Sequence, residues 1–555
     1  MAIDNQGSIL ISGAGPTGLA LAIALRKNGV PVRIISKAIE PQHGQRGSGV
    51  SPRTLELHTI LGTAPKILEV AVPIPPAHAY DPQDGTTIIK NFSLMPSREP
   101  TPHIPLNNYF MIGQNYHEAI LREYLEELGT VVEHGTELQS FTQTGDGVQV
   151  TLVNHANGGS TETVKVPWLV GADGAHSVVR KGLGLEFLGE TKSENKILIC
   201  DIKVEGTREV GLTCYGGSGA DALTSIVLSR PSGQKDNILW LAFMGHGIDA
   251  ESMVNSREKT IETFYEISKR RDIKFGDLVA SAIYCPNIRM VKKMRVDRVF
   301  VLGDAAHCHS PTGGQGLNSS IQDSINLGWK LAMAYHGSGS LKLLDSFDEE
   351  RLPVIAAMLN KTTDLLETNI RSEEGITAQR STDFLQLGVN YRNSSIILSD
   401  KSEKENARWL AYNPESETAA LPGDRAPDAP SLIDVNTGAK TNIFSILSPS
   451  MHTILLFGAP SNSYDDILDT LKQLPSGLAQ TVRIHPQGVD GSNLNAVDGV
   501  TFQVTVRDEG GYAAAGYNVE DSHKTWAVII RPDGIVGARV GSGEGITDYF
   551  KLVLA

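Results

Sequence analysis

The chain has 555 residues, 40% of them hydrophobic and 20% charged, which is the composition of a globular protein with more than one domain. Its formal net charge of −14 argues against a nucleic acid as partner, because phosphate backbones attract basic proteins. The apolar run from Ile9 to Leu25 is broken by glycines and a proline and follows no basic stretch, so we expect neither a membrane span nor a secretory signal.

The first elements predicted are a strand over 8–12, a helix over 16–27 and a strand over 31–36, which together begin a doubly wound sheet. The turn between the first strand and the helix is Gly13-Ala14-Gly15-Pro16-Thr17-Gly18. Glycines let the backbone turn tightly and approach a pyrophosphate, and the helix N-terminus offers N–H groups and a favourable dipole. In this strand-turn-helix context the pattern predicts a dinucleotide site.

The second strand ends differently from the usual dinucleotide site. An acidic residue normally stands there and binds the ribose hydroxyls, but this sequence has Ser36 followed by Lys37. A serine hydroxyl makes a single contact where a carboxylate binds two hydroxyls. We assign Ser36 and Lys37 to the cofactor site and leave the ribose contact open between Ser36 and Glu40.

Later elements follow in chain order. A helix is predicted over 118–128 and a buried strand over 168–170. From about residue 196 to 290, Val, Ile, Thr and Tyr alternate with turn residues, which predicts a mixed sheet of its own. The elements expected beyond it are a strand over 299–302 and helices over 316–335 and 344–366.

Two further glycine-containing segments follow buried strands. The first is Gly171-Ala172-Asp173-Gly174-Ala175-His176-Ser177-Val178-Val179-Arg180. The second is Gly303-Asp304-Ala305-Ala306-His307, continuing to Pro311-Thr312-Gly313-Gly314-Gln315-Gly316-Leu317-Asn318. Together with the first turn, their order and spacing resemble those of the class A flavoprotein aromatic hydroxylases, the group of para-hydroxybenzoate hydroxylase and phenol hydroxylase.

Shorter segments extend this resemblance over roughly residues 8 to 360. Arg46 with Ser51-Pro52-Arg53-Thr54-Leu55-Glu56 resembles the family's arginine loop and the helix after it. Gln114, with Glu118, Leu121 and Arg122, resembles its glutamine-led helix, and Phe347-Asp348-Glu349-Glu350-Arg351-Leu352-Pro353 resembles a late helix of the group.

The resemblance implies that the chain binds one FAD. Asp304 would bind the ribityl hydroxyls, which suits an ionised double acceptor. The helix after Gly314 would place its N-terminus at the flavin pyrimidine edge and stabilise the negative charge of the reduced flavin. The residues assigned to the cofactor are Gly13, Gly15, Pro16, Thr17, Gly18, Ser36, Lys37, Arg46, Gln114, Asp173, Asp304, Pro311, Gly314, Gly316, Leu317 and Asn318.

Neighbours of these residues are given structural roles. Asp173 helps to shape the region that FAD and NADPH share in this family, and Arg180 is expected to be its ion-pair partner. We expect His307 to be a packed, hydrogen-bonded histidine rather than a catalyst, and nothing in the sequence gives His309 a role.

The implied reaction is that of an FAD-dependent monooxygenase. NAD(P)H, with NADPH as the expected donor, would reduce FAD, and a flavin C4a-hydroperoxide formed with O2 would hydroxylate a phenolic or other electron-rich aromatic substrate. The cofactor supplies the oxygen chemistry, while the protein orients the ring and excludes water. A base near the phenol would help, but no catalytic residue is identified, because the place of a loop aspartate in phenol hydroxylase holds Ser48.

The substrate face is expected on the mixed sheet between about residues 196 and 290, whose apolar residues suggest an aromatic or prenylated ligand. Tyr109, Tyr116 and Tyr215 could bind the substrate, but a structural role is expected for each. Two alternatives stay open: a non-catalytic FAD-binding scaffold, and another flavin oxidoreductase such as an epoxidase. A halogenase is disfavoured, because the five tryptophans form no W-x-W pair.

The C-terminal segment resembles the thioredoxin-like tail of the phenol hydroxylase branch in Leu421-Pro422-Gly423-Asp424-Arg425-Ala426-Pro427-Asp428 and Trp526-Ala527-Val528-Ile529-Ile530-Arg531-Pro532-Asp533-Gly534. No cysteine follows Cys308, so this tail has no dithiol, and we expect packing or a homodimer contact. The four cysteines form no C-x-x-C pair, which predicts reduced thiols in a cytoplasmic protein and no metal site.

The predicted fold class is α/β: a Rossmann-like FAD-binding domain interleaved with a mixed β-sheet substrate domain, plus a C-terminal thioredoxin-like α/β domain. The monooxygenase region would cover 1–410, with FAD-binding segments at about 1–80, 108–185 and 290–370 and the substrate sheet at about 80–107 and 186–290. A linker over 411–429 would lead to the thioredoxin-like domain over 430–555.

Overall fold

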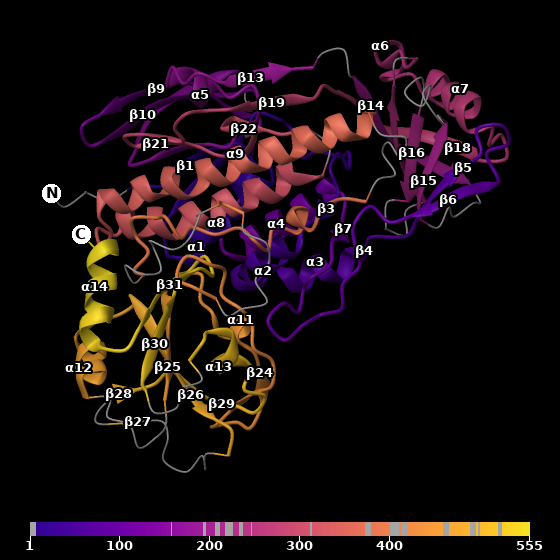
Figure 1. Ribbon diagram of the computed structural model, residues 1–555. Coiled ribbons are helices and arrows are strands. Elements are labelled where there is room, and N and C mark those ends of the chain that lie inside the picture. Colours follow the sequence, from indigo (N-terminus) through magenta and orange to yellow (C-terminus); the bar gives the residue numbers. More distant parts are fainter. Residues whose placement is uncertain are drawn as a thin grey trace.

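The computed structural model describes residues 7–156, 158–192, 196–205, 211–216, 226–231, 237–245, 247–310, 313–371, 379–399, 410–412, 420–458, 465–488, 496–497, 500–519 and 524–554. Over these residues the chain forms an α/β fold in which sheets and helices from distant parts of the sequence are interleaved (Figure 1). Within the same residues, no helix is both long and apolar enough to cross a bilayer.

The first sheet has six strands and is parallel except at one edge. Strand β1 lies between β2 and β12, and the chain returns after nearly 130 residues to add β21 beside β12. The strands, in sheet order, are β20 (Arg295–Val296), β21 (Val299–Val301), β12 (Leu169–Gly171), β1 (Ile9–Ser12), β2 (Val32–Ser36) and β8 (Glu133–His134). This is the doubly wound sheet that the sequence predicts.

Three small sheets surround it. They are the antiparallel β9 (Thr136–Thr144), β10 (Gly147–Asn154) and β11 (Ser160–Val166); the group β13 (Leu188–Thr191), β19 (Asn287–Met290) and β22 (His307–Cys308); and the group β3 (Gly49–Val50), β7 (Phe110–Met111) and β4 (Val72–Pro73). Strand β19 pairs with β22, next to the Asp304 turn, so the end of the segment predicted to be substrate sheet belongs with the cofactor region.

The mixed sheet has seven strands, and one face is covered by α6 (Ala250–Met253) and α7 (Arg257–Ser268) (Figure 1). Its strands, in sheet order, are β18 (Lys274–Tyr284), β14 (Ile197–Glu205), β17 (Ile238–Met244), β16 (Ile226–Pro231), β15 (Leu212–Gly216), β5 (Ala77–Tyr80) and β6 (Ile88–Phe92). The pairing of β15 with β5 is parallel and brings an early segment of the chain onto its edge.

Helices fill the middle of the molecule. The longest are α8 (Gln315–Tyr335) and α9 (Leu341–Arg371), and α8 packs directly on α1 (Pro16–Lys27) in the largest core (Figure 1). The others of this region are α2 (Pro52–Leu61), α3 (Ala64–Val70), α4 (Gln114–Glu127) and α5 (Val178–Gly182), with short 3-10 turns at Gly303–Ala305 and Thr382–Leu385. Helix α1 is apolar on all sides, which explains its burial: Leu19, Leu21, Ile23 and Leu25 are all inaccessible to solvent.

The C-terminal part contains a second seven-stranded sheet. Strand β25 pairs in parallel with β26 and antiparallel with β30. The strands, in sheet order, are β24 (Lys440–Thr441), β23 (Leu432–Asp434), β29 (Val504–Asp508), β26 (Ala479–Pro486), β25 (His452–Phe457), β30 (Trp526–Ile530) and β31 (Val536–Val540), and β27 (Ala496–Val497) pairs with β28 (Val500–Thr501). Its helices are α11 (Ile443–Ile446), α12 (Asp465–Gln473), α13 (Tyr512–Gly516) and α14 (Gly543–Val553).

One of the two apolar cores of this C-terminal sheet is shared with α8 and α9. Trp329 from α8 and Leu343 from α9 lie in one apolar cluster with residues of β25, α12 and α14. Part of the predicted linker, 413–419, lies outside the described residues.

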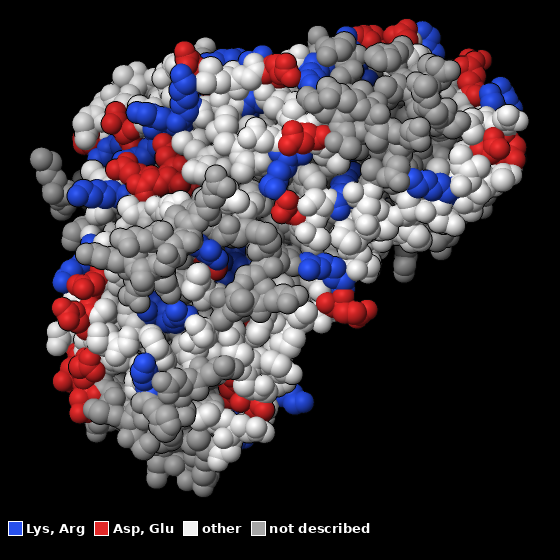
Figure 2. Space-filling view, viewed as in Figure 1, with Lys and Arg blue, Asp and Glu red and all other residues white. Residues whose placement is uncertain are grey.

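On the described part of the face in Figure 2, basic side chains stand singly or in small groups among acidic ones.

Candidate active site

Helix α8 connects the first and third glycine-containing motifs with the segment that follows the arginine loop. Ser324 Oγ donates to Thr17 O in the first turn at 2.8 Å, and Gly303 N, beside Asp304, donates to Asp323 Oδ2 at 3.1 Å. Near the start of the helix, Asn318 Oδ1 accepts from Ser51 N at 2.8 Å. One helix therefore holds segments that are some 300 residues apart in the chain.

The glycines of the first turn have different physical roles. A Cβ on Gly13 would stand 2.2 Å from Ala172 O, and the φ of +110° at Gly13 is one that only glycine adopts readily. A Cβ on Gly18 would stand 1.9 Å from Gly13 O, so both residues are needed for close packing. Gly15, at the N-terminus of α1, faces open space with no heavy atom within 4 Å, as a backbone must where a phosphate approaches it.

Asp304 has an exposed side chain, yet surrounding protein raises the pKa of its carboxyl through desolvation, against the opposing effect of His307 and Arg46. The side chain is thus open to solvent while protein groups stand close around it. Its carboxylate has no hydrogen-bond or ion-pair partner among the described residues. A bare acceptor in such a place suits a ligand that carries hydroxyl groups.

Asp173 lies next to the first turn but binds differently from the sequence prediction. Its Oδ2 accepts from Val178 N at 2.8 Å and so caps α5, while its Oδ1 is buried and has no partner in the described chain. The predicted ion pair with Arg180 is wrong. The guanidinium of Arg180 instead donates to two carbonyls, Ala305 O at 3.0 Å and Ala175 O at 2.8 Å, because it is drawn into the junction of the second and third motifs.

The arginine loop is anchored to the seven-stranded sheet. Gln45 donates from its backbone N and its Nε2 to the two oxygens of Asp201 on β14, at 2.7 and 2.9 Å, and its Oε1 accepts from Arg230 Nη1 on β16 at 3.0 Å. The next residue, Arg46, is exposed and has a φ of +42°. Gln114 N donates to Gln45 O at 2.9 Å, which brings the loop and the start of α4 together.

At the N-terminus of α8 the polar side chains mostly bind one another. Asn318 Nδ2 donates to Gly49 O, Gly314 O and Tyr109 Oη at 2.8–3.0 Å, so the side chain of Asn318 is fully engaged with protein and only its backbone is left for a ligand. Tyr109 is buried and structural, as expected. Gly314 is exposed, and Gly316 faces open space.

The remaining residues that the sequence assigns to the cofactor make fewer contacts with the three motifs. Pro16 and Leu317 are half-buried at the starts of α1 and α8, and Pro311 lies outside the described residues. Ser36 is half-buried at the end of β2, while the ammonium of Lys37 pairs with Glu137 at 2.7 Å on the surface. Gln114 Nε2 donates to Glu118 at 2.7 Å.

Sequence reasoning missed the residues behind the site, chiefly Gln45, Asp201, Asp323 and Ser324. A signal for two of them exists in α8, a central helix whose buried residues include an unusual number of polar ones. These are Gln315, Asn318, Ser319, Ser320, Gln322, Asp323, Ser324, Asn326 and Lys330. Buried polar groups need partners, so such a helix indicates a network rather than a simple packing element.

The open face of the seven-stranded sheet borders these turns. Strand residues whose side chains leave the α6–α7 side are half-exposed: Ile197, Ile199, Leu228, Trp240, Met244 and Tyr284. Tyr284 Oη donates to His309 O at 2.7 Å, and Gln45 binds Asp201 on the same face. Tyr215 points to the other face, where it stacks on Tyr80, so its structural role is confirmed.

These features fit FAD. The open space at Gly15 and Gly316, the bare carboxylate of Asp304 and the unpartnered Oδ1 of Asp173 belong to the three glycine-containing motifs, and no described residue fills them.

The comparisons with known proteins agree with this geometry. Residues 6–362 match the family model described as an FAD binding domain. A flavin-dependent monooxygenase of Mycobacteroides abscessus is 32% identical over 556 residues, covering 99% of this chain and 100% of that protein. The chain belongs to the flavin-dependent monooxygenases.

Two more proteins illustrate the range of this likeness. Pentachlorophenol 4-monooxygenase of Sphingobium chlorophenolicum is 27% identical over 548 residues, covering 97% of this chain and 95% of the relative. The crystal structure of aklavinone-11 hydroxylase with FAD and aklavinone shares the fold, with a TM-score of 0.79, 21% identity and 99% of each chain covered. This monooxygenase is therefore an FAD-dependent enzyme, and the resemblance read from its motifs is confirmed.

Proposed function

We propose that this monooxygenase hydroxylates a phenolic or other electron-rich aromatic compound with more than one ring, using NADPH as electron donor. The observation that carries the proposal is the half-exposed apolar face of the seven-stranded sheet, which meets the arginine loop at Gln45 and the third motif at His309.

The width of this face favours a large ring system. Its half-exposed apolar residues lie on four adjacent strands, β18, β14, β17 and β16. Adjacent strands are about 4.8 Å apart, so the face is about 14 Å wide. A single benzene ring would leave most of it in contact with water, whereas a flat polycyclic compound would cover it. Among relatives, pentachlorophenol 4-monooxygenase carries a phenol in its name, which supports an aromatic substrate.

The polar residues on this face would orient such a compound. Trp240 presents an indole N–H that is buried and has no partner in the described chain. The guanidinium of Arg230 lies 4.8 Å from the centre of the Trp240 ring and provides a positive field at the edge of the face. Burial lowers the pKa of Arg230 to about 10, so it stays charged at neutral pH and would favour a partly ionised phenol.

The cofactor contacts form part of the same proposal. Gly13 to Gly18 would bind the pyrophosphate, Asp304 the ribityl hydroxyls and the N-terminus of α8 the flavin ring, while Arg46 and Gln114 would contact FAD from the loop side. FAD supplies, when bound, the transfer of one oxygen atom from O2 to the substrate. The chain's own residues orient the ring and exclude water. A cytoplasmic location and a homodimer stay predictions of the sequence.

The experiment compares phenols of one ring and of several rings on the purified holoprotein. Visible absorbance establishes bound flavin, NADPH oxidation is followed at each phenol concentration, and 18O2 shows whether oxygen enters the product. We expect multi-ring phenols to raise kcat/KM about tenfold or more over phenol. Equal rates with and without every phenol tested, on flavin-loaded protein, would favour the scaffold alternative instead.

A variant of the sheet face tests where the substrate binds. Trp240→Leu should raise KM for the multi-ring phenol about tenfold with unchanged flavin content, because it removes ring contact and the N–H donor. Val279→Ala, an exposed position of β18, is the control and should leave KM unchanged. An unchanged KM in Trp240→Leu would place the substrate elsewhere.

A further inference from the structure

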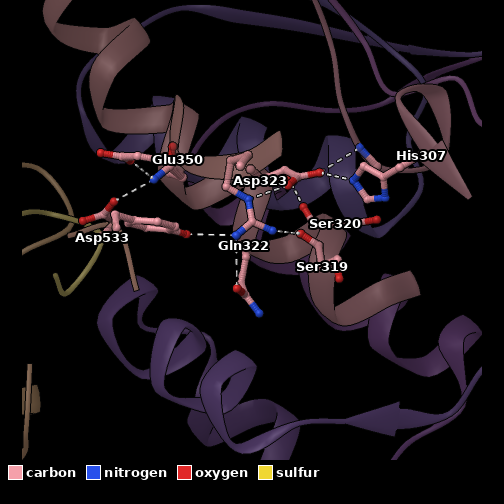
Figure 3. A network of polar contacts seen from close by, with 12 residues as sticks. His307, Ser319, Ser320, Gln322, Asp323, Glu350 and Asp533 are labelled. Atoms are coloured by element: carbon pink, nitrogen blue, oxygen red, sulfur yellow. Dashed lines mark hydrogen bonds and ion pairs between the residues drawn. The ribbon is translucent and has the colours of Figure 1, made fainter. Parts of the chain in front are cut away.

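The buried carboxylate of Asp323, on α8, receives hydrogen bonds from both sides of the Asp304 turn (Figure 3). Its Oδ2 accepts from Gly303 N at 3.1 Å and from His307 Nε2 at 2.7 Å. Gly303 precedes Asp304 directly and His307 follows three residues later. A single oxygen atom thus holds the turn on either side of the residue that faces the cofactor site.

The side chain at the tip of the turn does not help to hold it. The Asp304 carboxylate has no partner in the described chain, and Gly303 has a φ of +54° in a one-turn 3-10 helix. A Cβ on Gly303 would stand 2.6 Å from Thr17 Oγ1 and 2.8 Å from Ser320 Oγ, so the turn is wedged between the first motif and α8. Small shifts of this backbone would move the Asp304 carboxylate relative to the Gly13–Gly18 turn.

The anchor is itself held from behind. Arg351 Nε, on α9, donates to Asp323 Oδ1 at 2.7 Å, and the same guanidinium donates to Tyr391 Oη at 2.9 Å and to Ser319 O at 3.2 Å. Although burial opposes it, His307 and Arg351 keep the pKa of the Asp323 carboxyl below its usual range. All the groups that meet Asp323 are donors, which a carboxylate satisfies and an amide cannot.

The same contacts fix one proton of the two histidines. Ionised Asp323 is an acceptor only, so His307 Nε2 carries a hydrogen. On the other side of the ring, His307 Nδ1 lies 3.0 Å from His309 Nε2. His307 is buried and hydrogen-bonded, as expected from the sequence, but its partner gives it more than a packing role.

We propose that Asp323 and His307 are positioning residues for FAD binding: the Asp323 carboxylate, braced by Arg351, sets the Asp304 turn through Gly303 N and the His307 ring. The inference rests on the proposed contact of Asp304 with the ribityl hydroxyls.

The test measures the dissociation constant of FAD from the full-length holoprotein, by flavin fluorescence recovered on dilution, together with the melting temperature of each variant. His307→Gln retains an N–H donor toward Asp323, and His307→Leu removes it. Asp323→Asn replaces the acceptor by an amide, and Asp304→Asn tests the premise. Ser346→Ala, a buried residue of α9 that bonds within its own helix, is the matched control.

We expect His307→Leu and Asp323→Asn to weaken FAD binding about tenfold or more, because each removes a hydrogen bond to a charged group. His307→Gln should stay within about threefold of the parent, and Ser346→Ala should not change the constant. Should Asp323→Asn fail to fold, the two His307 variants, which keep the Asp323–Arg351 pair, decide the question.

Three results would overturn the proposal. Normal FAD affinity in His307→Leu, with loss in Asp304→Asn, would leave the proposed function standing and remove the positioning role. Equal loss in His307→Gln and His307→Leu would show that ring packing matters and not the donor. Unchanged affinity in Asp304→Asn would mean that the Asp304 contact itself, and the cofactor assignment built on it, is wrong.

Discussion

Gly13 and Gly15 are two residues apart, yet an added side chain would have different effects at the two positions. A methyl group on Gly13 would collide with Ala172 O, whereas one on Gly15 would enter open space in front of α1. The backbone at Gly15 has an ordinary φ of −76°. A side chain at Gly13 would therefore disturb the fold, whereas a side chain at Gly15 would obstruct the ligand.

Replacing each glycine separates these roles. Gly13→Ala should lower the free energy of unfolding by about 1–3 kcal/mol from the backbone conformation alone, with the clash in addition. Gly15→Val should leave apoprotein stability nearly unchanged and weaken FAD binding about a hundredfold, because its side chain takes the place of the pyrophosphate. Denaturant unfolding and flavin fluorescence measure the two effects, and normal FAD affinity in Gly15→Val would contradict this placement.

At this scale the sequence predicts local chemistry well and long-range partners poorly. The Gly13–Gly18 turn and Asp304 are recognisable because their chemistry is encoded in neighbouring residues. Gln45 and Asp201 are 156 positions apart, and no local pattern says that one carboxylate will receive both N–H groups of that glutamine. Nearness in sequence predicts an ion pair of Asp173 with Arg180, yet the side chains of both bind backbone groups.

Among the elements, α2 and α4 meet through two fully buried histidines. His58 Nε2 and His117 Nε2 are 3.0 Å apart, and His58 Nδ1 is 2.8 Å from Thr63 Oγ1. Burial lowers the pKa of both rings, to about 4 for His117, and the neighbouring ring adds to the effect at His58. The folded protein keeps both residues neutral.

This contact predicts a loss of stability in acid. The unfolded chain takes up protons on histidine below pH of about 6.5, while the folded chain does not. The stability is therefore complete above that pH and is lost as the pH falls toward 4. Each histidine contributes about 1.4 kcal/mol per pH unit to this slope.

His117→Gln should reduce the slope by about one histidine's share, since glutamine does not titrate. Urea unfolding at about pH 7.5, 6.5, 5.5 and 4.5 measures the free energy of unfolding across this range. An exposed-site variant, His43→Gln, is the control. An identical slope in His117→Gln and the parent would mean that this pair does not account for the acid sensitivity.

Element boundaries were predictable where local signals are strong. Helix α1 spans Pro16–Lys27 as expected, since a proline starts it and Gly29 follows its end. Helix α4 begins at Gln114, four residues before the predicted start, because its first turn is polar and lacks an apolar stripe. The addition of β5 and β6 to the mixed sheet depends on a parallel pairing across more than a hundred residues, which periodicity cannot reveal.

For the whole molecule, a turn of the C-terminal part is bound into the centre of the monooxygenase region. Arg531 Nη1 and Nη2 donate to the Glu350 carboxylate of α9 at 2.6 and 2.9 Å, and Lys330 Nζ of α8 donates to Glu350 at 2.7 Å. Asn326 Nδ2 donates to Asp533 Oδ2 at 3.1 Å, and Arg53 of α2 donates to Asp533 O at 3.0 Å. These side chains are all buried.

Removing one charge from this network should greatly lower the free energy of unfolding. Although burial opposes it, Arg531 and Lys330 hold the pKa of Glu350 below its usual range, so the carboxylate is charged inside the protein. Arg531→Leu should destabilise the folded state by about 3–5 kcal/mol, because it leaves Asp533 and Glu350 under-compensated. Lys472→Gln, on the surface of α12, should change it by less than about 0.5 kcal/mol. Urea titration measures both, and similar values for the two variants would contradict the prediction.

The domain boundaries stay predictions. A thioredoxin-like C-terminal domain agrees with the order β26-β25-β30-β31, in which a parallel pair is followed by an antiparallel pair. Yet Trp329 and Leu343 belong to one of its two apolar cores. Composition marks a linker but does not show that two buried charged residues on either side of it will pair, so the extent of this union could not be read from sequence.

The contact between α1 and α8 also determines how late in its synthesis the chain can complete its fold. Thr17 and Ser324, which it joins, are 307 residues apart. At about 5–20 residues per second, a ribosome needs on the order of 15–60 s to make the second partner after the first. Through that interval the surface of α1 that α8 covers in the folded protein lacks that cover, and the first and third motifs can be joined only when most of the polypeptide has emerged.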